Sequence, residues 1–313
     1  MQKIIILTGP TAVGKTNLSI RLAKEIGGEI ISADSMQVYK GMDIGTAKVT
    51  VKEQDGIKHH LIDILDPLES FSVADFTKYA TNSIQDIASR GSIPIIVGGT
   101  GFYIQALYKN IDFVETIENL ELVESLEKYV HAYGPIALHN RLKDIDPLSA
   151  DAIHPNNVKR VIRAIEYYET TQQKMSDHNL HQSQNEPVYD MLYYVLTMDR
   201  SKLYERINFR VEQMLEQGLI LEVTSLQAKG LSKEHQSMQG IGYKECLQYL
   251  DGDCSYEEMI ALIKQNSRHY AKRQLTWFRR EPYKEFVVKE DFQEDDNLIL
   301  QKILKDWKRK NND

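Results

Sequence analysis

The sequence has few cysteines and no long apolar run, and each absence excludes a class of protein. Only Cys246 and Cys254 occur in 313 residues, and they lack the spacing of a zinc site or a redox pair. No apolar stretch approaches the roughly 20 residues that span a bilayer. The initial segment "KIIIL" is too short for the apolar part of a signal peptide. We therefore expect a protein of the reducing cytoplasm that has no membrane partner. We also expect a monomer, although no feature of the sequence reports on the oligomeric state.

An excess of positive charge is also missing. The chain carries 38 Lys and Arg against 45 Asp and Glu, a formal net charge of −7, which argues weakly against a nucleic-acid partner. The stretch from Gln265 to Lys284 is an exception, because its six basic residues face the single acid Glu281. A local basic patch can bind phosphates on an acidic protein, since salt screens distant charges.

Apolar runs that end at glycine alternate with helical patterns in the first third of the chain. Buried strands are predicted at 3–8, 29–33 and 93–97, with helices at 14–26 and 74–89. This alternation is typical of a parallel sheet with crossover helices.

The pattern then becomes helical. Helices are predicted at 120–133, 135–143 and 157–169. We interpret 115–188 as a helical insertion domain whose polar stretch 170–187 is a mobile exit. A strand at 192–198 returns to the sheet, and the remaining chain is largely helical, at 201–217, 219–229 and 256–280. The core is thus 1–114 with 189–313, and residues 306–313 are predicted to fray.

A glycine-rich loop with the spacing of a phosphate-binding loop joins the first strand to the first helix. Its residues are Gly9, Pro10, Thr11, Ala12, Val13, Gly14, Lys15 and Thr16. Backbone N–H groups at a helix start converge on an anion, and the helix dipole favours negative charge there. Lys15 can reach phosphate oxygens, and Thr16 can place its hydroxyl on Mg²⁺. The predicted fold is therefore α/β and P-loop NTPase-like; an ordinary glycine turn is the alternative interpretation of the loop.

The carboxylate that many ATPases place at the end of an apolar strand is missing. The best such strand, 93–97, runs into Gly98-Gly99-Thr100-Gly101. Asp63 lies inside an apolar run and not after it. The sequence therefore predicts an anion site without the apparatus for hydrolysis.

Asp34 follows the second predicted strand. Ligands bind at the carboxyl edge of a parallel sheet, so Asp34 is predicted to lie close to the bound phosphate. A turn or helix-cap acid explains its position equally well. Gln37, three residues on, has the donor and acceptor suited to an adenine edge.

Seven segments resemble the bacterial tRNA dimethylallyltransferase family. They are, in order, "GPTAVGKT", "SADSMQVYKGMDIGTAK", "HHLIDILDP", "FSVADF", "VGGTGFY", "MQGIGYKE" and "AKRQLTWFRR". The resemblance implies transfer of the five-carbon group of dimethylallyl diphosphate to N6 of adenine 37 in the anticodon stem-loop of tRNA. Diphosphate is the leaving group, which explains a phosphate cradle without a hydrolytic acid.

The resemblance also implies roles for individual residues. Asp34 is implied as the general base toward the N6 amine, Thr100 as a catalytic residue near the diphosphate, and Arg210 as a diphosphate ligand. The glycine loop is implied to bind the diphosphate, with Mg²⁺ as cofactor on Thr16. Contacts with tRNA are implied for Asp34, Ser35, Met36, Gln37, Gly101, Lys159, Arg160, Val161, Ile162 and Arg163.

The basic run supplies a second candidate surface for tRNA. Arg268, Lys272 and Arg273 lie on the helix predicted at 256–280, and we expect them to contact backbone phosphates. A solvated basic face is the simpler interpretation. Adenine 37 must leave its stack to reach a site at the sheet edge.

Three other functions remain compatible with the residues. An ATP-dependent kinase shares the glycine loop but requires a metal-binding carboxylate. An enzyme that prenylates free adenine nucleotides shares the loop and Asp34. A non-catalytic tRNA-binding module leaves Lys15, Thr16 and Asp34 without a purpose.

Overall fold

The computed structural model describes residues 1–113 and 119–312. The chain forms two compact units, one made of Met1–Tyr108 with the residues from Val188 onward, the other of Lys109–Pro187. The predicted domain boundary at residues 114 and 115 lies outside the described residues. No helix among the described residues is long and apolar enough to cross a membrane.

A six-stranded, fully parallel sheet forms the centre of the larger unit, with the strand order β3-β2-β4-β1-β5-β6. The strands are β1 (Lys3–Thr8), β2 (Gly28–Ala33), β3 (His59–His60), β4 (Ile93–Gly98), β5 (Asp190–Thr197) and β6 (Glu285–Val288). The predicted α/β class with a parallel sheet is confirmed. The short edge strands β3 and β6 were not predicted.

Both faces of the sheet are buried, which explains why the strands read as continuous apolar runs. Successive side chains of a strand point to opposite faces. Ile4 and Ile6 of β1 accordingly pack in one core cluster, while Ile5 and Leu7 pack in another. The first cluster lies under α3 (Val73–Ser89) and α4 (Gly101–Tyr108); the second lies under α1 (Lys15–Ile26) and α14 (Asp296–Asn312).

The last helix corrects the prediction that residues 306–313 fray. Trp307 of α14 is only 8% exposed and belongs to the second core cluster with Leu18 and Leu22 of α1. Residue 313 lies outside the described residues.

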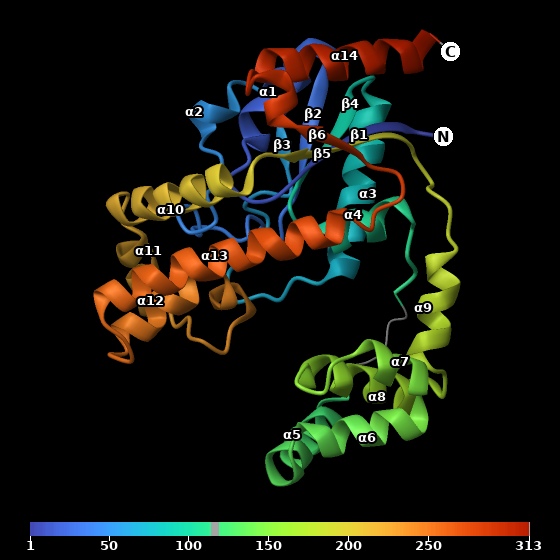
Figure 1. The fold of residues 1–313 in the computed structure, drawn as a ribbon, viewed down its shortest axis with the longest axis vertical. Helices are drawn as coiled ribbons and strands as arrows, with labels where there is room; N and C mark the ends of the chain where they lie inside the picture. The colour runs from blue at the N-terminus through green and yellow to red at the C-terminus, as the bar shows by residue number, and fades with distance from the viewer. Residues whose placement is uncertain (114–118, 313) are drawn as a thin grey trace. The chain divides into compact units, whose positions relative to one another are not determined.

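Four α-helices of the larger unit lie between β5 and β6 in the sequence. They are α10 (Arg200–Glu216), α11 (Leu219–Ala228), α12 (Tyr243–Leu250) and α13 (Tyr256–Phe278). In Figure 1, α10 and α13 run side by side, and two hydrogen bonds join them: Lys264 to Glu212 and Arg268 to Asn208. The short α2 (Val51–Gln54) belongs to the same unit.

All regular secondary structure among the described residues of the smaller unit is helical. Its helices are α5 (Leu120–Tyr133), α6 (Pro135–Ile145), α7 (Pro147–Ala152), α8 (Val158–Thr171) and α9 (Met175–Ser183). It has its own core, in which Leu126, Leu138 and Ile165 are almost completely buried. Helix α9 lies within the stretch 170–187, interpreted from the sequence as a mobile exit, for which no helix was predicted.

Candidate active site

Two adjoining cavities lie where the strands of the larger unit end. The smaller has a volume of about 370 Å³ and is lined by Thr11 and Asp34, which follow β1 and β2. The larger has a volume of about 720 Å³ and is lined by Lys15 and Thr16 at the start of α1. Four residues line both cavities: Ala12, Ala47, Arg210 and Met214.

The glycine loop leaves the start of α1 open to an anion. Gly14 precedes the helix with a φ of 100°, a left-handed conformation that favours glycine. The helix has no side-chain cap at its start and no acidic residue in its first turn. Its first N–H groups and the positive end of its dipole therefore have no carboxylate partner in the first turn.

Two cations and one carboxylate influence one another at this edge. Lys15 Nζ donates to the carbonyls of Gly9 and Pro10, both at 2.9 Å. Burial and the charge of Arg210 lower the pKa of Lys15 to about 7, against the opposing effect of Asp34. Burial also lowers the pKa of Arg210, again opposed by Asp34. An anion in the cavity would stabilise both cations, because each pays a desolvation penalty.

Asp34 is both a turn acid and a carboxylate at the cavity, the two interpretations of its position in the sequence. Its Oδ1 accepts hydrogen bonds from the N–H groups of Met36 (2.9 Å) and Gln37 (3.4 Å), so it is a turn acid. Among the described residues, both of its hydrogen bonds end on Oδ1. Asp34 also lines the smaller cavity. One carboxylate can therefore hold the turn and still face a ligand.

Thr100 is fixed beside Asp34 by the backbone. It follows β4, and its N–H donates to the carbonyl of Ala33 at 3.2 Å. Its hydroxyl is buried next to the phenol of Tyr270, a residue of α13 that lines the smaller cavity. Burial raises the pKa of that phenol, as does the charge of Asp34. Thr100 and Asp34 thus flank the same phenol.

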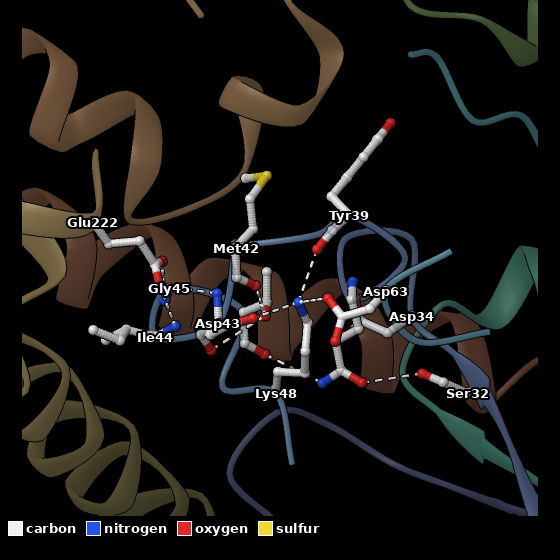
Figure 2. Close-up of polar contacts among 12 residues, drawn as sticks. Ser32, Asp34, Tyr39, Met42, Asp43, Ile44, Gly45, Lys48, Asp63 and Glu222 are labelled. Atoms are coloured by element: carbon white, nitrogen blue, oxygen red, sulfur yellow. Dashed lines mark hydrogen bonds and ion pairs between the residues drawn. The ribbon is translucent and has the colours of Figure 1, made fainter. Parts of the chain in front are cut away.

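Gln37 is not arranged to read an adenine edge. Its Oε1 accepts a hydrogen bond from Ser32 Oγ (3.0 Å), and its Nε2 donates to the Thr46 carbonyl (3.3 Å), as Figure 2 shows in part. Both ends of the amide are therefore engaged within the protein. This geometry corrects the expectation that the Gln37 amide faces a base: the amide joins the Ser32 hydroxyl to the Thr46 carbonyl.

Comparison with known proteins decides the family. The model of the IPP transferase family matches residues 37–281. The chain belongs to this family. It is 52% identical over 303 residues to a tRNA dimethylallyltransferase of Lachnoclostridium phytofermentans, covering 97% of each chain. A tRNA dimethylallyltransferase of Bacillus pumilus is 54% identical over 279 residues, which are 89% of this chain and 87% of the relative.

Solved structures agree with this assignment. The full-length tRNA isopentenylpyrophosphate transferase of Bacillus halodurans superimposes with a TM-score of 0.74 at 46% identity, covering 100% of this chain and 99% of that one. A eukaryotic dimethylallyltransferase acting on tRNA also gives a TM-score of 0.74, at 35% identity, over 88% of this chain and 70% of that one. The resemblance inferred from the motifs and the predicted class of enzyme, a prenyltransferase, are confirmed.

Gln274 of this IPP transferase belongs to the site, although the sequence motifs did not indicate it. It lies on α13 and is 5% exposed. Its Oε1 accepts a hydrogen bond from the Thr11 N–H (2.9 Å), and its Nε2 donates to the Gly99 carbonyl (3.0 Å). One amide thus joins the glycine loop to the end of β4. The segment "AKRQLTWFRR" contained it, but its partners are 263 and 175 residues away in sequence.

Replacing Gln274 by methionine is expected to destabilise the protein by about 1–3 kcal/mol, because the Thr11 N–H and the Gly99 carbonyl lose their partners. Urea unfolding of the variant and the parent measures this difference. Gln265→Met is the matched control, since Gln265 is exposed on the same helix. Equal unfolding midpoints for the two variants would contradict the bridging role.

The basic residues of α13 differ in their surroundings. Arg268 donates to Asn208 of α10 at 2.6 Å and is half-buried. Lys272 and Arg273 instead line a third, shallow cavity of about 400 Å³ together with Trp277 and Arg280. Lys272 and Arg273 are therefore the more accessible members of the predicted phosphate-contacting set.

The run from Lys159 to Arg163 on α8 contains both exposed and buried side chains. Lys159, Arg160 and Arg163 are exposed. Val161 (0% exposed) and Ile162 (5% exposed) lie in the core of the smaller unit. This corrects the expectation for these two side chains, which pack inside the unit and do not face a nucleic acid.

The remaining predicted contacts surround Asp34 and α4. Ser35 and Met36 line the smaller cavity. Gly101, the first residue of α4, is buried against the ring of Trp277: a Cβ there would lie 2.2 Å from Trp277 Cδ1. Gly101 thus allows α13 to approach α4 closely.

Proposed function

We propose that this protein is a cytoplasmic tRNA dimethylallyltransferase, which transfers the dimethylallyl group from dimethylallyl diphosphate to N6 of adenine 37. The observation that carries the proposal is the juxtaposition of Asp34, Lys15 and Arg210 around two adjoining cavities. A base and an anion site within one continuous space suit a reaction in which a proton and a diphosphate leave from neighbouring atoms.

The glycine loop and its cations suit the diphosphate. The loop acts here as a phosphate-binding loop, with the uncapped start of α1 offering N–H groups to the anion. The charge of Arg210 lowers the pKa of Lys15, so the two cations lie within electrostatic range of each other, and they line the larger cavity together. Both cations would stabilise negative charge as it builds on the leaving oxygen.

Mg²⁺ fits the donors at this position. Thr16 is exposed in the first turn of α1 and lines the larger cavity, so its hydroxyl is available as a ligand. Among the described residues, no group of three or more His, Cys, Asp or Glu could hold a metal ion. The ion would therefore be shared with diphosphate oxygens, the usual arrangement for Mg²⁺. When bound, it would neutralise charge on the leaving group.

The smaller cavity suits the five-carbon group and the acceptor amine. Its apolar lining includes Val211, Met214, Ile241 and Ile263. As the N6–carbon bond forms and the carbon–oxygen bond to diphosphate breaks, the amine nitrogen becomes cationic and its proton becomes acidic. Asp34 accepts that proton. Asp34 is thus a general base that acts during bond formation.

A polynucleotide acceptor is favoured over a free adenine nucleotide. The relatives reported above are named for tRNA, and Lys272 and Arg273 of α13 line a cavity together with Arg280, which follows the helix. We propose that the helical unit is an inserted tRNA-contacting domain. Its exposed Lys159 and Arg160 would bind phosphates of the anticodon stem-loop, as would α13.

A kinase is disfavoured by the strands beside β1. On one side, β4 ends in Gly98-Gly99-Thr100 without a carboxylate. On the other, β5 leads to Asp199, whose Oδ1 accepts hydrogen bonds from Ser201 and Lys202 as the cap of α10. Asp63 is paired with Lys48. None of these carboxylates is arranged as a metal ligand of ATP.

A single assay distinguishes the candidates. The protein is incubated with Mg²⁺, dimethylallyl diphosphate and unmodified tRNA. The tRNA is then digested, and the masses of its nucleosides are measured by mass spectrometry. We expect a five-carbon mass gain on adenosine that is absent from a transcript carrying guanosine at position 37. In a parallel reaction with adenosine monophosphate in place of tRNA, equal prenylation would favour the nucleotide enzyme. In a parallel reaction supplied with ATP, consumption of ATP without a mass gain would favour the kinase.

A further inference from the structure

The segment Asp43–Lys48 forms a wall shared by the two cavities. Gly45 and Thr46 line the smaller cavity, Asp43 and Ile44 line the larger one, and Ala47 lines both. The segment has neither helix nor strand. The N–H groups of Ala47 and Lys48 donate to carbonyls within the segment, but those of Asp43, Ile44 and Gly45 need partners from elsewhere in the chain.

Glu222 of α11 supplies those partners, as Figure 2 shows. Its Oε2 accepts hydrogen bonds from the N–H groups of Asp43 (2.9 Å) and Ile44 (2.8 Å). Its Oε1 accepts from the Gly45 N–H (3.2 Å) and from the Tyr243 hydroxyl (2.6 Å). Three consecutive N–H groups that converge on one anion form a concave site of the kind that binds phosphates and carboxylates. Here the protein fills it with its own side chain.

Gly45 shows how closely the wall is held. A Cβ at this position would lie 2.4 Å from the Tyr243 ring. Tyr243 is 1% exposed, so its ring cannot move aside easily. The backbone of the segment is therefore held by the Glu222 carboxylate and pressed against the Tyr243 ring.

The other end of the segment is fixed by charge. Lys48 has a side chain only 5% exposed, and its Nζ lies 2.6 Å from Asp43 Oδ1 and 2.6 Å from Asp63 Oδ1. It also donates to the Tyr39 carbonyl at 2.8 Å. Within the segment, the Thr46 carbonyl accepts from Gln37, whose backbone N–H is held by Asp34. The wall is thus continuous with the turn that contains the proposed general base.

We propose that Glu222 is a positioning residue, which shapes the substrate cavities by holding the backbone of Asp43–Gly45. The identity of the substrate in this inference rests on the proposed function. Lys15 and Asp34 have anchors of their own in the glycine loop and the Met36 turn. Loss of Glu222 therefore loosens the wall while the reacting groups stay in place.

Two substitutions remove the hydrogen bonds of Glu222 to different extents. Glu222→Ala removes every acceptor from the three N–H groups. Glu222→Gln keeps one oxygen, which can still accept from Asp43 and Ile44 while the new amide donates to the Tyr243 oxygen, so that only the Gly45 bond is lost. Glu216→Ala is the matched control, because Glu216 is exposed at the end of α10.

The experiment combines amide hydrogen exchange at residues 43–45, binding of inorganic diphosphate by calorimetry, and prenylation kinetics. For Glu222→Ala we expect exchange at these amides to rise and KM for dimethylallyl diphosphate to rise roughly tenfold to a hundredfold, as for lost hydrogen bonds to a charged group. The turnover number should change much less, and Glu222→Gln should be intermediate. Glu216→Ala should match the parent.

Unchanged exchange at residues 43–45 in Glu222→Ala would overturn the inference, as would a fall in turnover number with KM unchanged. If Glu222→Ala does not fold, the same criteria apply to Glu222→Gln. If the parent does not prenylate tRNA, the proposed function fails, while exchange and diphosphate binding still decide whether Glu222 shapes the cavities.

Discussion

Replacing Asp34 by asparagine is expected to lower the turnover number for prenyl transfer by about 10²–10⁴-fold, the usual contribution of a general base. Asparagine keeps an Oδ1 that can accept from the N–H groups of Met36 and Gln37, so the turn should persist. What is lost is the group that receives the amine proton. Single-turnover kinetics with saturating tRNA and dimethylallyl diphosphate measure this step.

Binding separates this role from a simple contact with substrate. The Asp34 charge raises the pKa of Lys15 and Arg210, but it would also repel an anion bound beside them. Asp34→Asn removes that repulsion, and bound diphosphate itself favours the charged cations, so affinity for inorganic diphosphate should be unchanged or higher. Affinity for tRNA should also be retained. Asp66→Asn is the matched control, because Asp66 Oδ1 accepts from the Leu68 N–H in a similar turn and lines neither cavity. Loss of tRNA binding in step with turnover would argue against proton transfer by Asp34.

The sheet was predictable because its determinants are local. An apolar run of strand length bounded by glycine needs burial on both faces, and Ile4–Leu7 supply it with side chains alternating between two cores. The short edge strands lack such a run. His59 and His60 pair with β2, and Glu285–Val288 pair with β5; both depend on a neighbour distant in sequence.

Two helices were missed, each for its own reason. The stretch that contains Met175–Ser183 is polar, and none of its helical residues is buried, so no periodic apolar face indicated a helix. Residues 306–313 look like a charged tail, yet Trp307 is packed against α1. A tail is distinguished from a docked helix by the surface that receives it, and that surface lies almost three hundred residues earlier.

The residues of the candidate site also differ in how local their sequence signals are. Gly9, Lys15, Thr16 and Asp34 were predictable, because a glycine loop and a strand end are local patterns that meet at one sheet edge. Glu222 and Gln274 were not predictable, because their backbone partners lie 177–179 residues away for Glu222 and 175 and 263 residues away for Gln274. Gln37 was assigned to a base, but a side-chain amide next to irregular backbone often serves that backbone. Residues that shape a site from outside leave little local signal.

Arg210→Gln should reduce the turnover number by about 10²–10³-fold, the typical cost of removing one donor that stabilises developing charge. Arg210 lines both cavities and lies within electrostatic range of Lys15. Arg210→Lys should fall in between, because it keeps the charge but loses the planar fork that binds two phosphate oxygens together. Steady-state kinetics with varied dimethylallyl diphosphate measure both variants.

The pattern across variants, and not the size of one effect, identifies the role of Arg210. Unlike Asp34→Asn, Arg210→Gln removes a cation, so affinity for inorganic diphosphate must fall together with turnover. Lys202→Gln is the control, since Lys202 is exposed on the same helix and pairs with Glu294. If Arg210→Gln raises KM while the turnover number stays constant, the arginine binds ground and transition states equally. Stabilisation of the departing diphosphate would then belong to Lys15, the loop N–H groups and the proposed Mg²⁺.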